Sequence, residues 1–280
     1  MDAKSQRRFI YQVLDKSPEK PDIVLLLSRF KKELAARGLS LLGITTDASS
    51  LYPEAIQELF PGVTHQLCRF HAIKELNKSV LGAAAGVRKE FKERIPKRPR
   101  GRPTKESRQA SEEISRLEAQ HKELFDNRYL YVQRELEKSE RDTLERISEP
   151  FPELRQLRSV SEAIHQLYDG PNGMPEAVKK LEELRARVKE NEKLSASMKR
   201  LFSPNLEKSL AFLDVKGFPG TSNAVERGNR RYRKMQKSVY RVRTLTHIRQ
   251  RIALDMLRER GLLVRAKAVK LQHAWRNGCG

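Results

Sequence analysis

Short apolar runs alternate with helical patterns along the first part of the chain. Three runs have the length and composition of buried strands: residues 8–14, 39–45 and 63–67. Between the first two, residues 22–37 have apolar positions at helical spacing: Ile23, Leu26, Leu27, Phe30 and Leu34. Residues 52–60 predict a second helix before the third run. A further helix follows the third run. This order of strands and helices predicts right-handed crossovers and an α/β layer.

The pattern changes near residue 96. Residues 97–105 (KRPRGRPTK) are basic and rich in Pro and Gly, and the following stretch to residue 149 is charged and helical with few breakers. Breaks that contain Pro and Gly then separate further helices up to about residue 210. We therefore divide the chain into residues 1–95 with the α/β pattern, an all-α segment at 96–210, and a basic C-terminal region at 211–280.

A basic helix with a single acid is predicted in the C-terminal region. Residues 221–243 (TSNAVERGNRRYRKMQKSVYRVR) follow a breaker run and open with N-cap residue types, so the helix begins there with Glu226 in its first turn. The charges that follow Glu226 in this segment are all positive: Arg227, Arg230, Arg231, Arg233, Lys234, Lys237, Arg241 and Arg243. Two interpretations of Glu226 stay open at this point. It closes a capping box with Asn223, or it is a metal ligand among charges that attract DNA.

The charge balance indicates a polyanionic partner. The chain has 57 Lys and Arg against 36 Asp and Glu, a net charge of +21, and a pI near 10.1. Nucleic acid is the first candidate. A membrane surface is the competitor, but we find neither an apolar run of transmembrane length nor a signal peptide, so we expect no membrane partner. Cys68 and Cys279 offer no disulfide framework, which agrees with a reducing, cytoplasmic compartment.

Asp47 is a candidate ligand because it closes a strand of the buried type. Open α/β sheets bind their ligands at this edge of the strands. The alternative is that Asp47 only caps the next helix, as Asp often does. Together with Glu226 it supplies two carboxylates, which is the minimum protein contribution to a Mg²⁺ ion that also takes phosphate oxygens.

Cys68 and His71 are three residues apart, so they share one face of a helix. This spacing is half of a zinc site, but we find no second Cys/His pair at ligand spacing. Two other interpretations remain. Cys68 lies in the core with His71 at the rim of the sheet, or His71 faces the metal site and orients the scissile phosphate or water.

Two segments together resemble a known family. TTDASSLYPEAIQELFPGVTHQLCRFHAIKELNK and TSNAVERGNRRYRK are similar to the mutator-like and related prokaryotic insertion-sequence transposases of the DDE class. The similarity spans most of residues 8–95 and 211–255. It implies an RNase H-like fold interrupted by an all-α insertion, in which Asp, Asp and Glu bind Mg²⁺ or Mn²⁺. Asp47 matches the second Asp, Cys68 and His71 match a Cys-x-x-His pair, and Glu226 matches the Glu.

The resemblance also implies an activity and partners. Members of this family cut DNA and transfer strands, so duplex DNA at the element ends and at the target is the expected partner. We expect a homodimer or higher oligomer in the DNA complex, and a prokaryotic cytoplasmic protein associated with the nucleoid through DNA. The alternatives are a catalytically inactive DNA-binding remnant of a transposase and an RNase H-like nuclease.

The first catalytic Asp of the family has no counterpart here. It belongs to a first strand, and Asp2 has only Met1 before it. Asp15 closes a strand that the topology places at a non-catalytic position. We therefore expect an N-terminally truncated transposase.

Two sets of basic residues are candidate DNA contacts. Pro99-Arg100-Gly101-Arg102-Pro103 matches an AT-hook core, in which Arg100 and Arg102 enter the minor groove of A·T-rich DNA. The alternative for this segment is a solvated linker. In the basic helix, the residues expected to contact phosphates are Arg227, Arg230, Arg231, Lys234 and Lys237.

Overall fold

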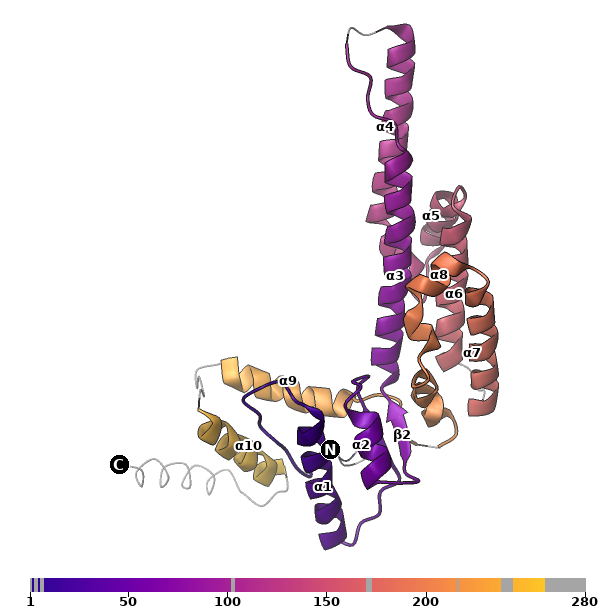
Figure 1. Ribbon diagram of the computed structural model, residues 1–280. Coiled ribbons are helices and arrows are strands. Elements are labelled where there is room, and N and C mark those ends of the chain that lie inside the picture. Colours follow the sequence, from indigo (N-terminus) through magenta and orange to yellow (C-terminus); the bar gives the residue numbers. More distant parts are fainter. Residues whose placement is uncertain are drawn as a thin grey trace. The chain divides into compact units, whose positions relative to one another are not determined.

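The chain folds as two compact units, which a computed structural model describes. The first unit comprises residues 1–68 and 217–280, and the second comprises residues 69–216. The described residues are 2, 5, 8–101, 104–169, 173–215, 217–237 and 244–259. Within them the fold is mostly helical, with one small sheet of two parallel strands (Figure 1).

The sheet belongs to the first unit. The elements of this unit are α1 (Lys20–Ala36), β1 (Gly43–Thr46), α2 (Tyr52–Leu59), β2 (Thr64–Leu67), α9 (Asn223–Lys237) and α10 (Leu245–Glu259). The two strands pair in parallel, with Gly43 opposite Thr64 and Thr46 opposite Leu67, and α2 connects them. Their carboxyl ends therefore meet at one edge of the sheet.

The helices α1 and α2 follow the predicted periodicity. A reciprocal capping box between Glu19 and Asp22 starts α1, and a proline lies in its first turn. One face of α1 buries Ile23 and Leu27 against Ile56 of α2. Burying each such side chain contributes about 1.5–3 kcal/mol relative to leaving it in water.

The prediction of a strand at residues 8–14 was wrong. These residues form no regular element in the structure. Phe9 packs on the ring of Phe30 in α1 at 5.9 Å between centroids, and Tyr11 packs against the buried face of α10. Arg8 forms an ion pair with Asp255 of α10 at 2.6 Å. The residues of this apolar run are half-buried, and the side chains that pack lie against helices α1 and α10 where a sheet was expected.

The second unit is all-α within its described residues. Its elements are α3 (Arg69–Arg94), α4 (Lys105–Asp126), η1 (Arg128–Tyr131), α5 (Lys138–Ser148), α6 (Pro152–Asp169), α7 (Met174–Lys189), α8 (Glu192–Ser197), η2 (Lys199–Phe202) and η3 (Leu206–Leu213). The described residues between 96 and 210 include no strand, which agrees with the predicted all-α segment. The core is centred on α6, where Val160 and Ile164 are fully buried.

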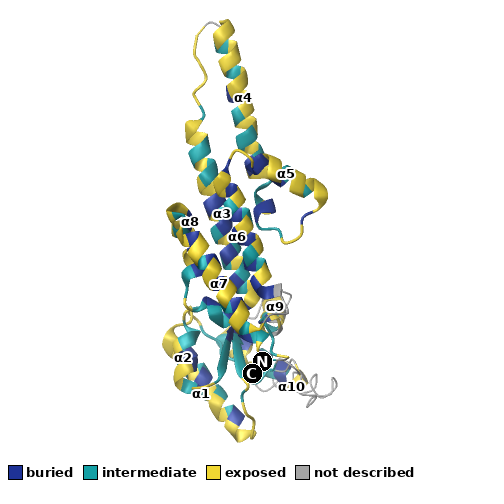
Figure 2. Cartoon of the chain, turned by 90° about the vertical axis from the view of Figure 1, so that its right-hand side faces the viewer, coloured by how far each residue is buried: buried dark blue, intermediate teal, exposed yellow. Residues whose placement is uncertain are grey.

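The two longest helices of this unit, α3 and α4, form an antiparallel hairpin (Figure 1). The amino-terminal half of α3 buries Ala72, Leu76 and Val80 in the core. The outer half of the hairpin is mostly exposed or half-buried (Figure 2). A reciprocal capping box between Thr104 and Ser107 fixes the start of α4. The basic segment that we took for a linker connects these two helices.

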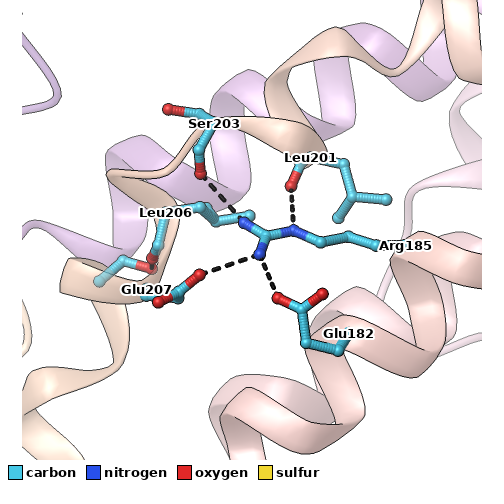
Figure 3. Close-up of polar contacts among 7 residues, drawn as sticks. Glu182, Arg185, Leu201, Ser203, Leu206 and Glu207 are labelled. Carbon is cyan, nitrogen blue, oxygen red and sulfur yellow. Dashed lines mark hydrogen bonds and ion pairs between the residues drawn. The ribbon is translucent and has the colours of Figure 1, made fainter.

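A largely shielded guanidinium, that of Arg185, holds the chain around η2 (Figure 3). Arg185 Nε donates to the carbonyl oxygen of Leu201 at 2.9 Å, and Nη2 donates to that of Ser203 at 3.0 Å. Nη1 pairs with Glu207 Oε1 at 2.9 Å and also with Glu182. The Arg185 side chain is only 13% exposed, so these contacts are largely shielded from water.

The segment that returns to the first unit packs on β1. The ring of Phe218 lies against the backbone of Gly43, where a Cβ would meet Phe218 Cε2 at 2.3 Å. The hydroxyl of Thr45 donates to the carbonyl oxygen of Pro219 at 3.1 Å. Because Gly43 and Thr45 are two residues apart on one strand, both contacts lie on the same face of the sheet.

We predict that Arg185→Ala destabilises the second unit by roughly 2–4 kcal/mol, because it strands two carbonyl oxygens and a half-buried carboxylate. The matched control is Arg187→Ala, an exposed position of the same helix, for which a change within about 0.5 kcal/mol is expected. Urea unfolding followed by far-UV circular dichroism measures both. Equal unfolding midpoints for the two variants would contradict a structural role for Arg185.

We predict that Gly43→Ala destabilises the first unit by about 1–3 kcal/mol, because the added methyl group overlaps the Phe218 ring. The control is Gly86→Ala in α3, where a Cβ meets nothing within 4 Å and helix propensity favours Ala by up to about 1 kcal/mol. Hydrogen exchange of peptides from β1 and β2 reports the change. Exchange as slow in Gly43→Ala as in the control protein would show that Phe218 does not pack there.

Candidate active site at the strand ends

Two candidate residues follow neighbouring strands at the same edge of the sheet. Asp47 comes directly after β1, and Cys68 comes directly after β2. The backbone N–H of Cys68 donates to the carbonyl oxygen of Thr46 at 2.7 Å, so strand pairing extends one bond beyond β2. Topology therefore gathers Asp47 and Cys68 at the carboxyl edge, where open α/β sheets bind ligands.

Asp47 is exposed and does not cap α2. Its Oδ1 accepts the backbone N–H of Ser49 at 3.1 Å, which is the pattern of an Asx turn. The residue that precedes α2 is Leu51. Burial raises the pKa of the Tyr52 hydroxyl, and the negative charge of Asp47 adds to this shift. The helix-capping alternative for Asp47 thus gives way to a turn residue whose carboxylate is open to solvent.

Cys68 is fully buried and contacts the chain that leads into α9. Its Sγ accepts the backbone N–H of Ser222 at 3.3 Å. These two residues are 154 positions apart in the sequence. The contact fixes the start of α9 next to the end of β2.

Glu226 lies in the first turn of α9, as predicted from the sequence. Ser222 Oγ donates to Glu226 Oε1 at 3.1 Å, and the Glu226 N–H donates to the Ser222 carbonyl oxygen at 3.1 Å. In a capping box the acid accepts the N–H of the residue before the helix. Here Ser222 precedes the helix and gives its N–H to Cys68, while Asn223 is the exposed first helical residue.

Two side chains of the first unit at this edge form a candidate metal cluster. One ligand atom each of Cys68 and Glu226 lies within 4.8 Å of the other. His71 is half-buried in the first turn of α3, three residues after Cys68. Asp47 is not a member of this cluster, and its predicted sharing of an ion with Glu226 stays a prediction.

The chemistry of these donors fits a divalent cation held through Glu226. The carboxylates of Asp47 and Glu226 are hard oxygen donors, which Mg²⁺ and Mn²⁺ prefer. The sulfur of Cys68 and the imidazole of His71 are softer donors, which suit zinc. Glu226 belongs to both sets of donors. A measurement of which metal ion the protein binds therefore distinguishes the two sets.

Exposed cations continue along α9 from Glu226. Arg227, Arg230 and Lys234 are exposed, as expected for phosphate contacts. The side chains of Arg231 and Lys237 lie outside the described residues. Arg233, which the sequence prediction omitted from the DNA contacts, is also exposed.

Helical geometry aligns part of this charge with the acid. At about 100° per residue, positions four and seven after Glu226 return to its face of the helix. Arg230 and Arg233 occupy these positions. The spacing from Glu226 is a sequence signal that identifies Arg233. Ser222 was likewise missed as a partner of Glu226, although it stands four residues before it.

The AT-hook candidate falls in the connection between α3 and α4. Arg100 is exposed there, and Gly101 has a φ of 115°, a backbone conformation that favours glycine. Arg102 and Pro103 lie outside the described residues. The AT-hook stays a prediction.

A family model for a DDE-class transposase of the ISL3 group matches residues 11–252. Comparisons with curated proteins and with solved structures found no significant match. Among the described helices, none is long and apolar enough to cross a membrane. The match confirms the resemblance to DDE transposases and covers the sheet, the helical unit and the basic helix. The chain therefore belongs to the ISL3 family of DDE transposases.

Proposed function

We propose that this transposase cuts DNA and transfers strands by divalent-metal-dependent phosphoryl transfer, with Asp47 and Glu226 as ligands of the ion. One observation carries the proposal. The contacts of Ser222 hold Glu226 beside Cys68, the residue that follows β2, while Asp47 follows the adjoining strand β1. Family membership supports it further, because DDE transposases use a divalent metal on an RNase H-like fold and bind DNA.

The surroundings of Glu226 hold its carboxylate in place. A carboxylate in the first turn of a helix is stabilised by the helix dipole. The Ser222 hydroxyl donates to one oxygen of Glu226 and restrains its rotamer. A bound divalent ion supplies activation of a hydroxyl nucleophile and stabilisation of the leaving oxygen. Arg230 and Arg233, on the same helical face, bind the phosphates of the DNA beside the reacting group.

His71 has a supporting role in this proposal. It follows Cys68 by three residues, in the first turn of α3, which begins at Arg69 and so does not include Cys68. The imidazole would orient the scissile phosphate or the attacking hydroxyl by hydrogen bonding.

A second candidate function is DNA binding without catalysis. The net charge of +21 favours it, because phosphate attraction needs no metal ion. The two functions separate experimentally, since only the first depends on Glu226.

We predict that, when the protein is assayed with the family's first catalytic Asp supplied on an added first strand, Glu226→Gln lowers Mg²⁺- or Mn²⁺-dependent nicking of supercoiled DNA that carries the element ends by more than about 100-fold. Loss of residues that merely hold a metal ligand already costs about 10–100-fold. The control is Glu58→Gln on the exposed face of α2, which is expected to nick at the wild-type rate. DNA binding and the circular dichroism spectrum of both variants should match the wild type.

Two results would contradict this assignment. Nicking that survives Glu226→Gln places the catalytic groups elsewhere. One zinc ion per chain, with no response to added Mg²⁺, would assign the ion to the softer donors.

We predict that affinity for duplex DNA falls steeply as salt rises, because each bound phosphate releases a counterion. Arg233→Ala and Arg230→Ala should each reduce the slope of log K against log salt by about 1, across all DNA sequences. Arg29→Ala, an exposed position on α1, serves as the control and should leave the slope unchanged. Fluorescence anisotropy at several salt concentrations measures the slope. An unchanged slope in Arg230→Ala and Arg233→Ala alike would remove α9 from the DNA interface.

A further inference from the structure

We propose that Cys68 is a positioning residue, whose sulfur sets the first turn of α9 and thereby the carboxylate of Glu226. The inference rests on the proposed function in one respect, that Glu226 is the residue whose position matters for metal binding. The contact itself belongs to the fold and can be tested separately.

Cys68 is a rigid anchor. Its side chain has no exposed surface, and its backbone N–H is bound to Thr46 of β1 at 2.7 Å. The position of Sγ is therefore fixed by the sheet. Because Sγ accepts a hydrogen bond from this fixed position, the residue that donates to it has little freedom to move.

Ser222, which Cys68 holds, also forms a hydrogen bond with the candidate ligand Glu226. Ser222 gives its backbone N–H to Cys68 Sγ at 3.3 Å and its hydroxyl to Glu226 Oε1 at 3.1 Å. Ser222 is itself buried, so water does not readily replace the sulfur as acceptor. The sheet, the sulfur, the serine and the carboxylate thus form a continuous chain of contacts.

The neighbouring contacts hold a different part of the segment. Phe218 packs on Gly43, and Pro219 accepts a hydrogen bond from Thr45. These two contacts dock the segment upstream of the helix. Removal of the Cys68 sulfur therefore leaves the segment docked and loosens the first turn of α9, so the expected effect is local.

A backbone N–H can donate to either a sulfur or an oxygen atom. A serine in place of Cys68 therefore distinguishes a positioning role of Cys68 from a role as a metal ligand. Cys68→Ser keeps an acceptor at this site, although its shorter reach lengthens the hydrogen bond. Cys68→Ala removes the acceptor. If Cys68 were instead a thiolate ligand of zinc together with His71, serine would fail as completely as alanine.

The test compares Cys68→Ala, Cys68→Ser and a matched control, Ile56→Val. Ile56 is buried in the same unit and lies in the cluster between α1 and α2, so its truncation weakens the core without touching Ser222. The first readout is deuterium uptake of the peptide that spans residues 217–227. The second is the Mn²⁺ affinity of each variant, measured by electron paramagnetic resonance.

Positioning by Cys68 predicts a specific pattern. Uptake at residues 222–226 rises at least about tenfold in Cys68→Ala, rises less in Cys68→Ser, and stays at the wild-type level in Ile56→Val. The Mn²⁺ dissociation constant increases about 10–100-fold in Cys68→Ala, as for other residues that hold a ligand. In the nicking assay kcat falls with KM for DNA unchanged, because the loss concerns the reacting centre.

Two outcomes would overturn the inference: wild-type exchange and Mn²⁺ affinity in Cys68→Ala, or equal loss in Cys68→Ser and Cys68→Ala with one zinc ion per chain in the wild type. The proposed function has its own criterion. If Glu226→Gln leaves the Mn²⁺ affinity unchanged, the function proposed for Glu226 fails, while faster exchange in Cys68→Ala still supports positioning.

Discussion

The hydrogen bond from the Ser222 N–H to Cys68 Sγ is the contact on which the candidate site depends. It joins the end of β2 to the start of α9 across 154 positions of sequence. Loop-closure entropy grows only slowly with the length of the intervening chain, so a long insertion adds little cost. A few specific contacts in the first unit, at Gly43, Thr45 and Cys68, are then sufficient to fix the returning segment.

The second unit tolerates its place in the middle of the sequence because it has a core of its own. The buried faces of α3, α6 and α7 meet within residues 69–216, and Arg185 satisfies the carbonyl groups of Leu201 and Ser203. Such a unit folds around local contacts. The sheet and the basic helix of the first unit therefore do not need to supply its stability.

The sequence periodicity predicted the positions of the elements of the first unit better than it predicted which elements pack against one another. The helical pattern of Ile23, Leu27 and Leu34 and the breakers before Asn223 are local signals, and α1 and the start of α9 appear where expected. The run at residues 8–14 shows the limit, because an apolar pattern reports burial but not which backbone lies beside it. The composition change near residue 96 coincides with the connection between α3 and α4, and our three-part division of domains stays a prediction.

The role of Asp47 and Glu226 at the site stays a prediction, and the contacts that hold Glu226 were missed. Asp47 and Glu226 were singled out by strand ends and charge, which are visible in one sequence. The partnership of Ser222 with Cys68 was not, because a hydrogen bond between residues so far apart leaves no periodic signal. Asn223 had the spacing of a capping box, but the helix begins one residue earlier than that interpretation requires, with Asn223 already inside it. Arg233 could have been added to the candidate DNA contacts from the sequence, because seven residues along a helix return it to the face of Glu226.

The central claim is that Asp47 and Glu226 share one divalent ion at the carboxyl edge of the sheet. A crystal of the protein soaked in Mn²⁺ tests it most directly, since manganese gives an anomalous signal that locates the ion. The account predicts one anomalous peak with an oxygen of Asp47 and an oxygen of Glu226 both at about 2.0–2.4 Å. A peak bound by Cys68 Sγ and the His71 ring, with Asp47 turned away, would contradict it.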